Sequence, residues 1–111
     1  MEIIVSEVND IILVSLEGKL DSTTAPDAEA EINKYIEKKV PKMVVSLKET
    51  SYVSSAGLRV FLATAKRMTA AGAAVKFCCP NDIVKEILDI SGFSAILDVK
   101  DSQDEALGDL G

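Results

Sequence analysis

The sequence predicts one α/β domain with a mixed sheet of about four or five strands and about four helices. Three observations lead to this prediction. A length of 111 residues suits a single hydrophobic core. Two β-branched runs joined by a turn open the chain, and a strand, a helix and a strand follow one another in its middle. We therefore expect residues 1–111 to form one domain.

The first two elements predict an antiparallel hairpin. The runs "EIIVSEV" and "IILVSLEG" flank Asn9-Asp10, a dipeptide typical of tight turns. The segment "KLDSTTAPDAEAEINKYIEKKV" then predicts a helix, because Thr23 or Thr24 can cap it and Pro26 suits its first turn. Its apolar face is expected to contain Ala28, Ile32, Tyr35 and Ile36.

A β-α-β unit is predicted after Pro41, which we expect to stop the first helix. "KMVVSL" is typical of a buried strand, and "KETSYV" is expected to be a loop. Helical spacing of apolar residues predicts a helix from Ser55 to Ala71 that ends at Gly72. "AAVKFCC" completes the unit, so its two strands should be parallel and its crossover right-handed. The predicted apolar stripe of the helix comprises Leu58, Phe61, Leu62, Ala65 and Met68.

The last third of the chain predicts two short helices. Asn81 can cap "DIVKEILDI", and "AILDV" is a candidate for a last short strand. Ser102 and Glu105 have capping-box spacing, so a short terminal helix, frayed at its end, is expected over "SQDEALGDL". The inward side of the first of these helices is expected to comprise Ile83, Val84, Ile87, Leu88 and Ile90.

Charge and composition argue against several classes of partner and chemistry. The 12 basic and 18 acidic residues give a net charge of −6, which repels phosphate backbones and anionic lipid, so neither nucleic acid nor a membrane is an expected partner. The first ten residues carry acids where a signal peptide carries Lys or Arg, which predicts a cytoplasmic protein. The absence of histidine excludes Ser-His-Asp triads and histidine metal sites. We expect no catalytic residue, metal or cofactor.

The two cysteines are adjacent, at positions 78 and 79. Alternation along a strand would point Cys78 and Cys79 to opposite faces, and redox pairs usually read C-x-x-C. We therefore interpret both as small buried hydrophobes.

The stretch "SYVSSAGLRV" stands where a strand gives way to a helix, a place where sites collect in α/β folds. Ser54 and Ser55 both suit a helix cap, and Gly57 suits close helix packing. A phosphate on Ser55 would be tolerated, because the unpaired N–H groups of a helix start favour an anion. Neither a G-x-S-x-G elbow nor a Walker loop is present. The residues alone leave cap and functional site as alternatives.

The helix that follows contains Arg59, Lys66 and Arg67 but no acid, in a chain that is otherwise acidic. This pattern is compatible with a docking surface for an acidic partner and with an ordinary solvated face. Projection at 100° per residue places Arg59, Val60, Ala63, Thr64 and Arg67 on the side opposite the apolar stripe.

The segments "YVSSAGLRVFLATAKRM", "MVVSL" and "LEGKLDSTTAPD" resemble the STAS-domain anti-sigma factor antagonists of bacteria over nearly the whole chain. The family's serine motif commonly reads Asp-Ser-Ser/Thr-Gly-Leu. Matching on Gly57-Leu58 implies that Ser55 is the phosphorylated serine, with Ser54 as the alternative. Ser54 then stands in place of the usual acid, and Ala56 replaces the second hydroxyl.

The resemblance extends to two more positions. Ser46 stands where the family often has Asp, and "GKLD" matches the family's G-x-L-D. The match implies that Asp21 lies in a loop near the serine and helps recognition, although a turn or cap acid is an equal alternative. The predicted partner-binding residues are Asp21, Ser54, Ser55, Ala56, Gly57, Arg59, Val60, Ala63 and Arg67.

The resemblance implies a regulatory protein rather than an enzyme. Its unphosphorylated form would bind an anti-sigma factor that is also a serine kinase, and would thereby free the sigma factor. Phosphorylation of Ser55 would break that complex, and a PP2C-like phosphatase would restore it. Two alternatives stay open: a STAS scaffold or transporter-associated module in which Ser55 is never phosphorylated, and a small protein that binds a nucleotide at the helix start.

Overall fold

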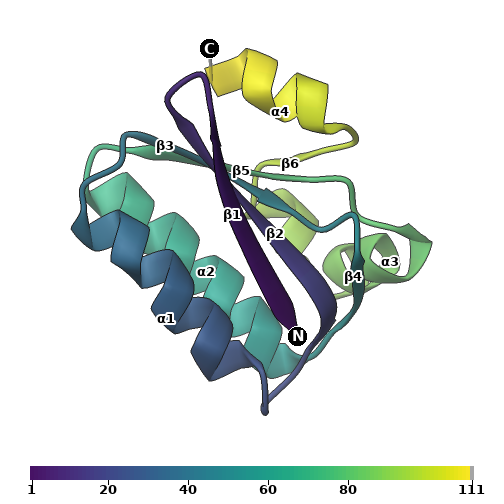
Figure 1. Cartoon of the computed structure of the whole chain (residues 1–111). Helices are drawn as coiled ribbons and strands as arrows, with labels where there is room; N and C mark the ends of the chain where they lie inside the picture. Colours follow the sequence, from purple (N-terminus) through teal and green to yellow (C-terminus); the bar gives the residue numbers. More distant parts are fainter. Residues whose placement is uncertain (111) are drawn as a thin grey trace.

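The computed structural model describes residues 1–110 and contains six strands and four α-helices in those residues (Figure 1). The strand order is β1-β2-β3-β5-β6, with β4 paired to β2; the β1/β2 pair is antiparallel and every other pair is parallel. The α/β class with a mixed sheet is therefore confirmed. The elements are β1 (Glu2–Val8), β2 (Ile11–Leu20), α1 (Ala25–Glu37), β3 (Lys42–Ser46), β4 (Thr50–Val53), α2 (Ser55–Ala70), β5 (Ala74–Cys78), α3 (Asp82–Ile90), a 3-10 turn (Phe93–Ala95), β6 (Val99–Lys100) and α4 (Gln103–Leu110).

The predicted hairpin is present. Asn9 and Asp10 have φ values of 50° and 68°, as a two-residue turn with left-handed residues requires. The register runs from Val8 opposite Ile11 to Glu2 opposite Glu17. The hairpin thus places β1 at one edge of the sheet.

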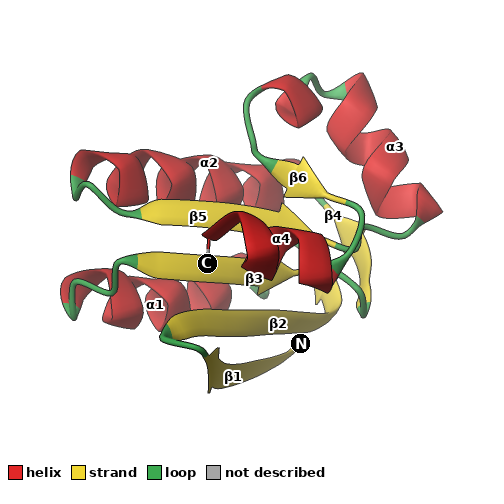
Figure 2. Cartoon of the chain, turned by 90° about the horizontal axis from the view of Figure 1, so that it is seen from above, coloured by secondary structure: helices red, strands yellow, loops and turns green. Residues whose placement is uncertain are grey.

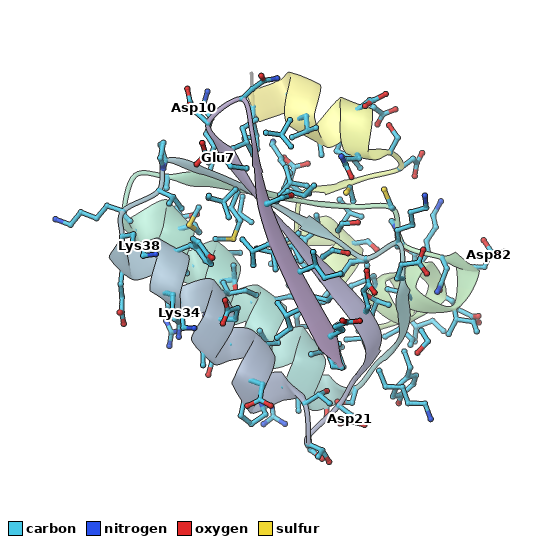
Figure 3. The ribbon with its side chains drawn as sticks, viewed as in Figure 1. Glu7, Asp10, Asp21, Lys34, Lys38 and Asp82 are labelled. Carbon is cyan, nitrogen blue, oxygen red and sulfur yellow. The ribbon has the colours of Figure 1, made fainter. Side chains whose placement is uncertain are left out.

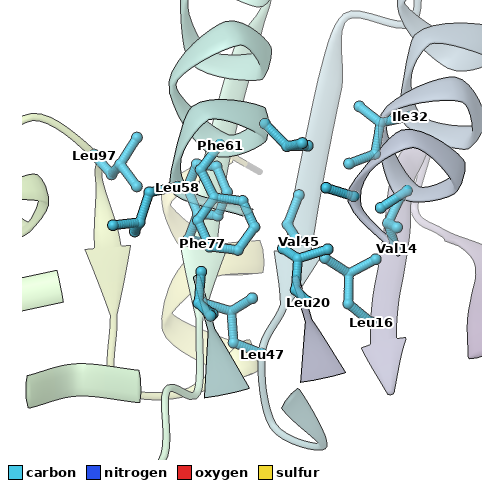
Figure 4. Packing of buried hydrophobic residues seen from close by; sticks show 14 of the residues in the cluster. Val14, Leu16, Leu20, Ile32, Val45, Leu47, Leu58, Phe61, Phe77 and Leu97 are labelled. Carbon is cyan, nitrogen blue, oxygen red and sulfur yellow. The ribbon is translucent and has the colours of Figure 1, made fainter. Parts of the chain in front are cut away.

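Helices cover the two faces of the sheet unequally (Figure 2). α1 and α2 lie side by side on one face, above the main core, where Phe61 and Phe77 pack with ring centroids 5.1 Å apart (Figure 4). α4 lies on the opposite face and covers a much smaller apolar cluster. That smaller cluster comprises Ile11, Val44, Cys78, Ala106 and Leu110.

The prediction of a loop over "KETSYV" is wrong for its last four residues, because Thr50–Val53 forms strand β4. This strand pairs in parallel with the end of β2, after an irregularity between Gly18 and Lys19. The buried Thr50 hydroxyl donates a 2.6 Å hydrogen bond to the carbonyl of Leu16. A four-residue strand shows little alternation of apolar and polar residues, so pairing with β2 determines its conformation. The sheet consequently has six strands where four or five were expected.

The first helix begins after Thr24 as predicted, but the hydrogen bonds at its start and the position of its end differ from the prediction. Thr24 occupies the N-cap position but its hydroxyl donates to the carbonyl of Lys19, and Oδ1 of Asp21 accepts from the N–H groups of Thr23 and Thr24 instead. The helix ends at Glu37, ahead of Pro41, and the chain turns through Lys39 at a φ of 61°. A carboxylate from outside the helix therefore organises its start, and a left-handed residue ends the helix before the proline is reached.

Two further expectations are corrected: which residues of α3 are buried, and how the two cysteines are oriented. α3 buries Val84 and Leu88, but Ile83 and Ile90 are 58% and 79% exposed, because this short helix contacts the rest of the chain with one face only. Cys79 leaves the strand at a φ of 60° and contacts the same cluster as Cys78, so the two side chains do not lie on opposite faces.

The thiol of Cys78 is fully buried, and this burial raises its pKa to about 12. A thiol with that pKa stays protonated at neutral pH. It behaves as the small buried hydrophobe that the sequence predicts, whereas Cys79 is only half-buried.

Candidate functional site

The junction between β4 and α2 lies directly beside the end of β2. Leu20 and Val53 are partners in the parallel register, and the N–H of Ser54 donates a 2.8 Å hydrogen bond to the carbonyl of Leu20. Asp21 is the next residue after Leu20, and Figure 3 shows it on the loop at the end of the molecule where α1 and α2 begin. Asp21 thus directly follows the residue whose carbonyl is hydrogen-bonded to Ser54.

The two serines of the motif have different structural roles. Ser54 is extended, with φ −86° and ψ 177°, and its Oγ accepts a 3.4 Å hydrogen bond from the N–H of Gly57. Ser54 is therefore the N-cap of α2. Ser55 is the first residue of the helix and is exposed, so its hydroxyl is free of the capping role and accessible from solvent.

Gly57 holds the first turn of α2 against the sheet. A Cβ at this position would lie 2.8 Å from Cγ of Leu20 and 2.9 Å from Cγ1 of Val53, distances that real Cβ atoms do not adopt. The close approach of helix and strands therefore requires a residue without a side chain. Because Gly57 is buried, it supports the site from inside rather than presenting a surface to a partner.

Asp21 also has a structural role. Its carboxylate accepts hydrogen bonds from the backbone N–H groups of Thr23 at 2.9 Å and Thr24 at 3.2 Å. These backbone hydrogen bonds lower the pKa of Asp21 below its ordinary value. The side chain consequently carries a negative charge in a fixed orientation at the start of α1. Asp21 therefore acts as the turn acid that the sequence offered as one of two alternatives.

The predicted outer face of α2 is not a free surface. Val60 is only 5% exposed and Thr64 2% exposed, and the Thr64 hydroxyl is bonded to the carbonyl of Val60. Arg67 donates a 2.7 Å hydrogen bond to Oδ1 of Asn33 and lies 4.0 Å from a carboxylate oxygen of Glu29.

The cause of this error is α1, which lies alongside α2 and covers that side (Figure 1). A projection of one helix cannot show a second helix beside it. Of the residues predicted there, Arg59 and Arg67 are exposed and Ala63 is half-buried.

A groove of about 360 Å³ separates the first turns of α1 and α2. It brings together Ala56, Arg59 and Val60, three of the predicted partner-binding residues, with residues of α1 that the sequence did not single out as a site. Nothing in the local pattern of α1 indicated this, because the groove exists only where two helices distant in the sequence lie side by side. Its lining comprises Ser22, Ala25, Pro26, Glu29, Ala56, Arg59 and Val60.

Comparison with known proteins agrees with this architecture. A family model described as the STAS domain matches residues 2–106. The chain belongs to the STAS domain family. Its sequence is 31% identical to BtrV of Bordetella bronchiseptica over 106 residues, which covers 96% of this chain and 91% of the relative. It is 30% identical to the anti-sigma F factor antagonist of Paenibacillus polymyxa over 101 residues, which covers 90% of this chain and 86% of the relative.

Solved structures have the same STAS fold. The unphosphorylated anti-sigma factor antagonist SpoIIAA superimposes with a TM-score of 0.83 at 18% identity, covering 98% of this chain and 96% of that one. The phosphorylated form of SpoIIAA from Bacillus gives a TM-score of 0.76 at 16% identity, covering 99% of this chain and all of that one.

Ser46 of this STAS domain lies away from the face that carries α2. It is 5% exposed, stands opposite Cys78 in the β3–β5 register, and alternates with Val45 so that it shares the α4 face with Val44. Its hydroxyl accepts a 3.5 Å hydrogen bond from the N–H of Lys48. Ser46 therefore does not belong to the Ser54–Ser55 surface.

Within residues 1–110, no three Cys, Asp or Glu side chains are grouped as a metal site would need. None of the helices described there is long and apolar enough to cross a membrane.

Proposed function

We propose that this STAS domain is an anti-sigma factor antagonist that is controlled by phosphorylation of Ser55. In its unphosphorylated form it binds an anti-sigma factor and so releases the sigma factor to RNA polymerase. The names of its relatives support the antagonist role, since the Paenibacillus protein is an anti-sigma F factor antagonist and a Listeria monocytogenes protein, 27% identical over 99 residues, is an anti-sigma-B factor antagonist.

The assignment of Ser55 rests on one observation, which is that the two serines have different structural roles. Ser54 uses its hydroxyl to cap α2, whereas Ser55 is exposed on the first turn, at the position that matches the family's phosphorylated serine. A hydroxyl at the surface is open to a kinase. A phosphate there would also sit at the positive end of the helix, which tolerates it in the folded domain.

In this proposal the partner is itself the kinase, and a PP2C-like phosphatase reverses the reaction. Phosphorylation adds about −1.5 to −2 charges to the surface formed by Ser55, Ala56 and Arg59. An interface that excludes water penalises an unpaired charge, so the complex dissociates. The protein acts as substrate and competitor rather than as an enzyme, and it works in the cytoplasm, where sigma factors bind RNA polymerase.

The test is phosphorylation with a purified cognate anti-sigma kinase and ATP, followed by intact-mass and fragment mass spectrometry. We expect one added phosphate on Ser55 and none in Ser55→Ala. Ser54→Ala is the matched control: it loses a helix cap worth about 1 kcal/mol but retains the phosphate acceptor. A phosphate found on Ser54 in the wild type would contradict the residue assignment.

A further inference from the structure

Arg59 lies one helical turn beyond Ser55 on α2, and both residues are exposed. Residues at positions i and i+4 share one face of a helix, with Cβ atoms about 5–6 Å apart. Helical side chains lean toward the N-terminus, so a long side chain covers the turn that precedes it. The surface within reach of the Arg59 guanidinium therefore includes the Ser55 hydroxyl.

The charge of Arg59 is not used by the fold. The other arginine of α2, Arg67, holds α1 through Asn33 and Glu29. None of the ion pairs found within residues 1–110 includes Arg59, although it lines the same groove as Glu29. An exposed guanidinium without an acidic partner is available to bind an anion that is added to the folded protein, such as a phosphate group.

A phosphate on Ser55 would be added next to a groove that already carries a negative charge. Glu29 lines this groove from α1, together with Ala56 and Arg59 of α2. A phosphate dianion added near this acid needs a cation nearby. Arg59 is the basic residue among those that line the groove.

We propose that Arg59 is the intramolecular receptor for the phosphate of phosphorylated Ser55, an inference that builds on the phosphorylation proposed above. An anion placed four residues before a cation is the favourable order on a helix. The planar guanidinium binds phosphate through two parallel hydrogen bonds. The free backbone N–H groups at the start of the helix also stabilise the anion.

This pairing gives phosphorylation two effects on the surface. It adds negative charge at Ser55, and it draws Arg59 away from the groove, where the free guanidinium is otherwise open to an acidic group of a partner. The unphosphorylated surface is thus basic at Arg59, and the phosphorylated surface is neutralised there. The switch removes an attraction as well as adding a repulsion.

The decisive measurement is the second pKa of the phosphate by 31P NMR titration, with phosphoserine installed at position 55 during translation so that no kinase is needed. A nearby cation favours the dianion and lowers this pKa. We expect Arg59→Gln to raise it by about 0.2–0.7 pH units, the range that an exposed ion pair produces. Lys66→Gln, which removes an exposed cation farther along the same helix, is the matched control and should leave the value unchanged.

Equal pKa values in the wild type and Arg59→Gln would overturn the proposal. So would a shift of the same size in Lys66→Gln, because it would show a general effect of net charge. Circular dichroism of each variant establishes that it is folded, and Arg59→Lys, which retains the charge without the planar fork, should give an intermediate pKa. Failure of this pairing would leave kinase-dependent phosphorylation of Ser55 intact, and the two proposals are therefore tested separately.

Discussion

The first turn of α2 and the turns that follow it have different tasks in the same helix. The later turns pack against the sheet on one side and against α1 on another, with Phe61 and Met68 fully buried and Arg67 bonded to α1. The first turn is anchored from below by Gly57 but presents Ser55 to solvent. The buried turns therefore contribute most of the stability of the helix. The Ser55 hydroxyl lies at the surface, where an added charge disturbs few packed side chains.

The largest expected effect comes from the buried part of the helix. Phe61→Ala removes a fully buried ring that packs on Phe77, and we expect the free energy of unfolding to fall by about 3–5 kcal/mol in urea titrations. Leu62→Ala, at the half-buried neighbouring position, should cost clearly less. Similar losses for the two variants would contradict the assignment of the helix's stability to its buried side.

A smaller loss is expected where the two parts of the helix meet. Gly57→Ala places a Cβ against the side chains of Leu20 and Val53, which are buried and cannot swing away, so we expect a loss of about 1–3 kcal/mol in the same titrations. Gly108→Ala in α4 is the matched control. A Cβ there would meet none of the described atoms within 4 Å, and it should stabilise the domain by about 0.5–1 kcal/mol. Equal effects of the two substitutions would argue against the close contact at Gly57.

The smallest effect on stability, with the sharpest effect on function, is expected at Ser55. Ser55→Asp adds charge at an exposed helix start, so the free energy of unfolding should change by less than about 1 kcal/mol. Its affinity for the anti-sigma partner, measured by calorimetry, should fall roughly tenfold or more through charge repulsion. Ser55→Asn, uncharged and of similar size, should bind nearly as well as the wild type. Unchanged binding by a folded Ser55→Asp protein would argue against an electrostatic switch.

The elements with strong local signals were predictable. Neighbours within a few residues determine the Asn9-Asp10 turn, the apolar stripe of α2 and the cap of α4. In that cap, Oγ of Ser102 accepts a hydrogen bond from the N–H of Glu105. Strand β4 was missed, because Thr50–Val53 owes its conformation to the distant end of β2. The position of the α1 cap was predicted at Thr24, but the group that accepts the hydrogen bonds was not, since several polar side chains there compete for the same backbone groups.

Residue type and local spacing were enough to predict the α/β class, the hairpin, the serine motif at the start of α2 and the exclusion of histidine chemistry. The tertiary structure decided which serine caps the helix, that Val60 and Thr64 face α1, and that Arg59 is left without an acidic partner among residues 1–110. The physical reason is that burial and pairing depend on contacts between segments far apart in the chain. Periodicity reports which side of a helix is apolar, and only the packed fold shows what lies against the other side.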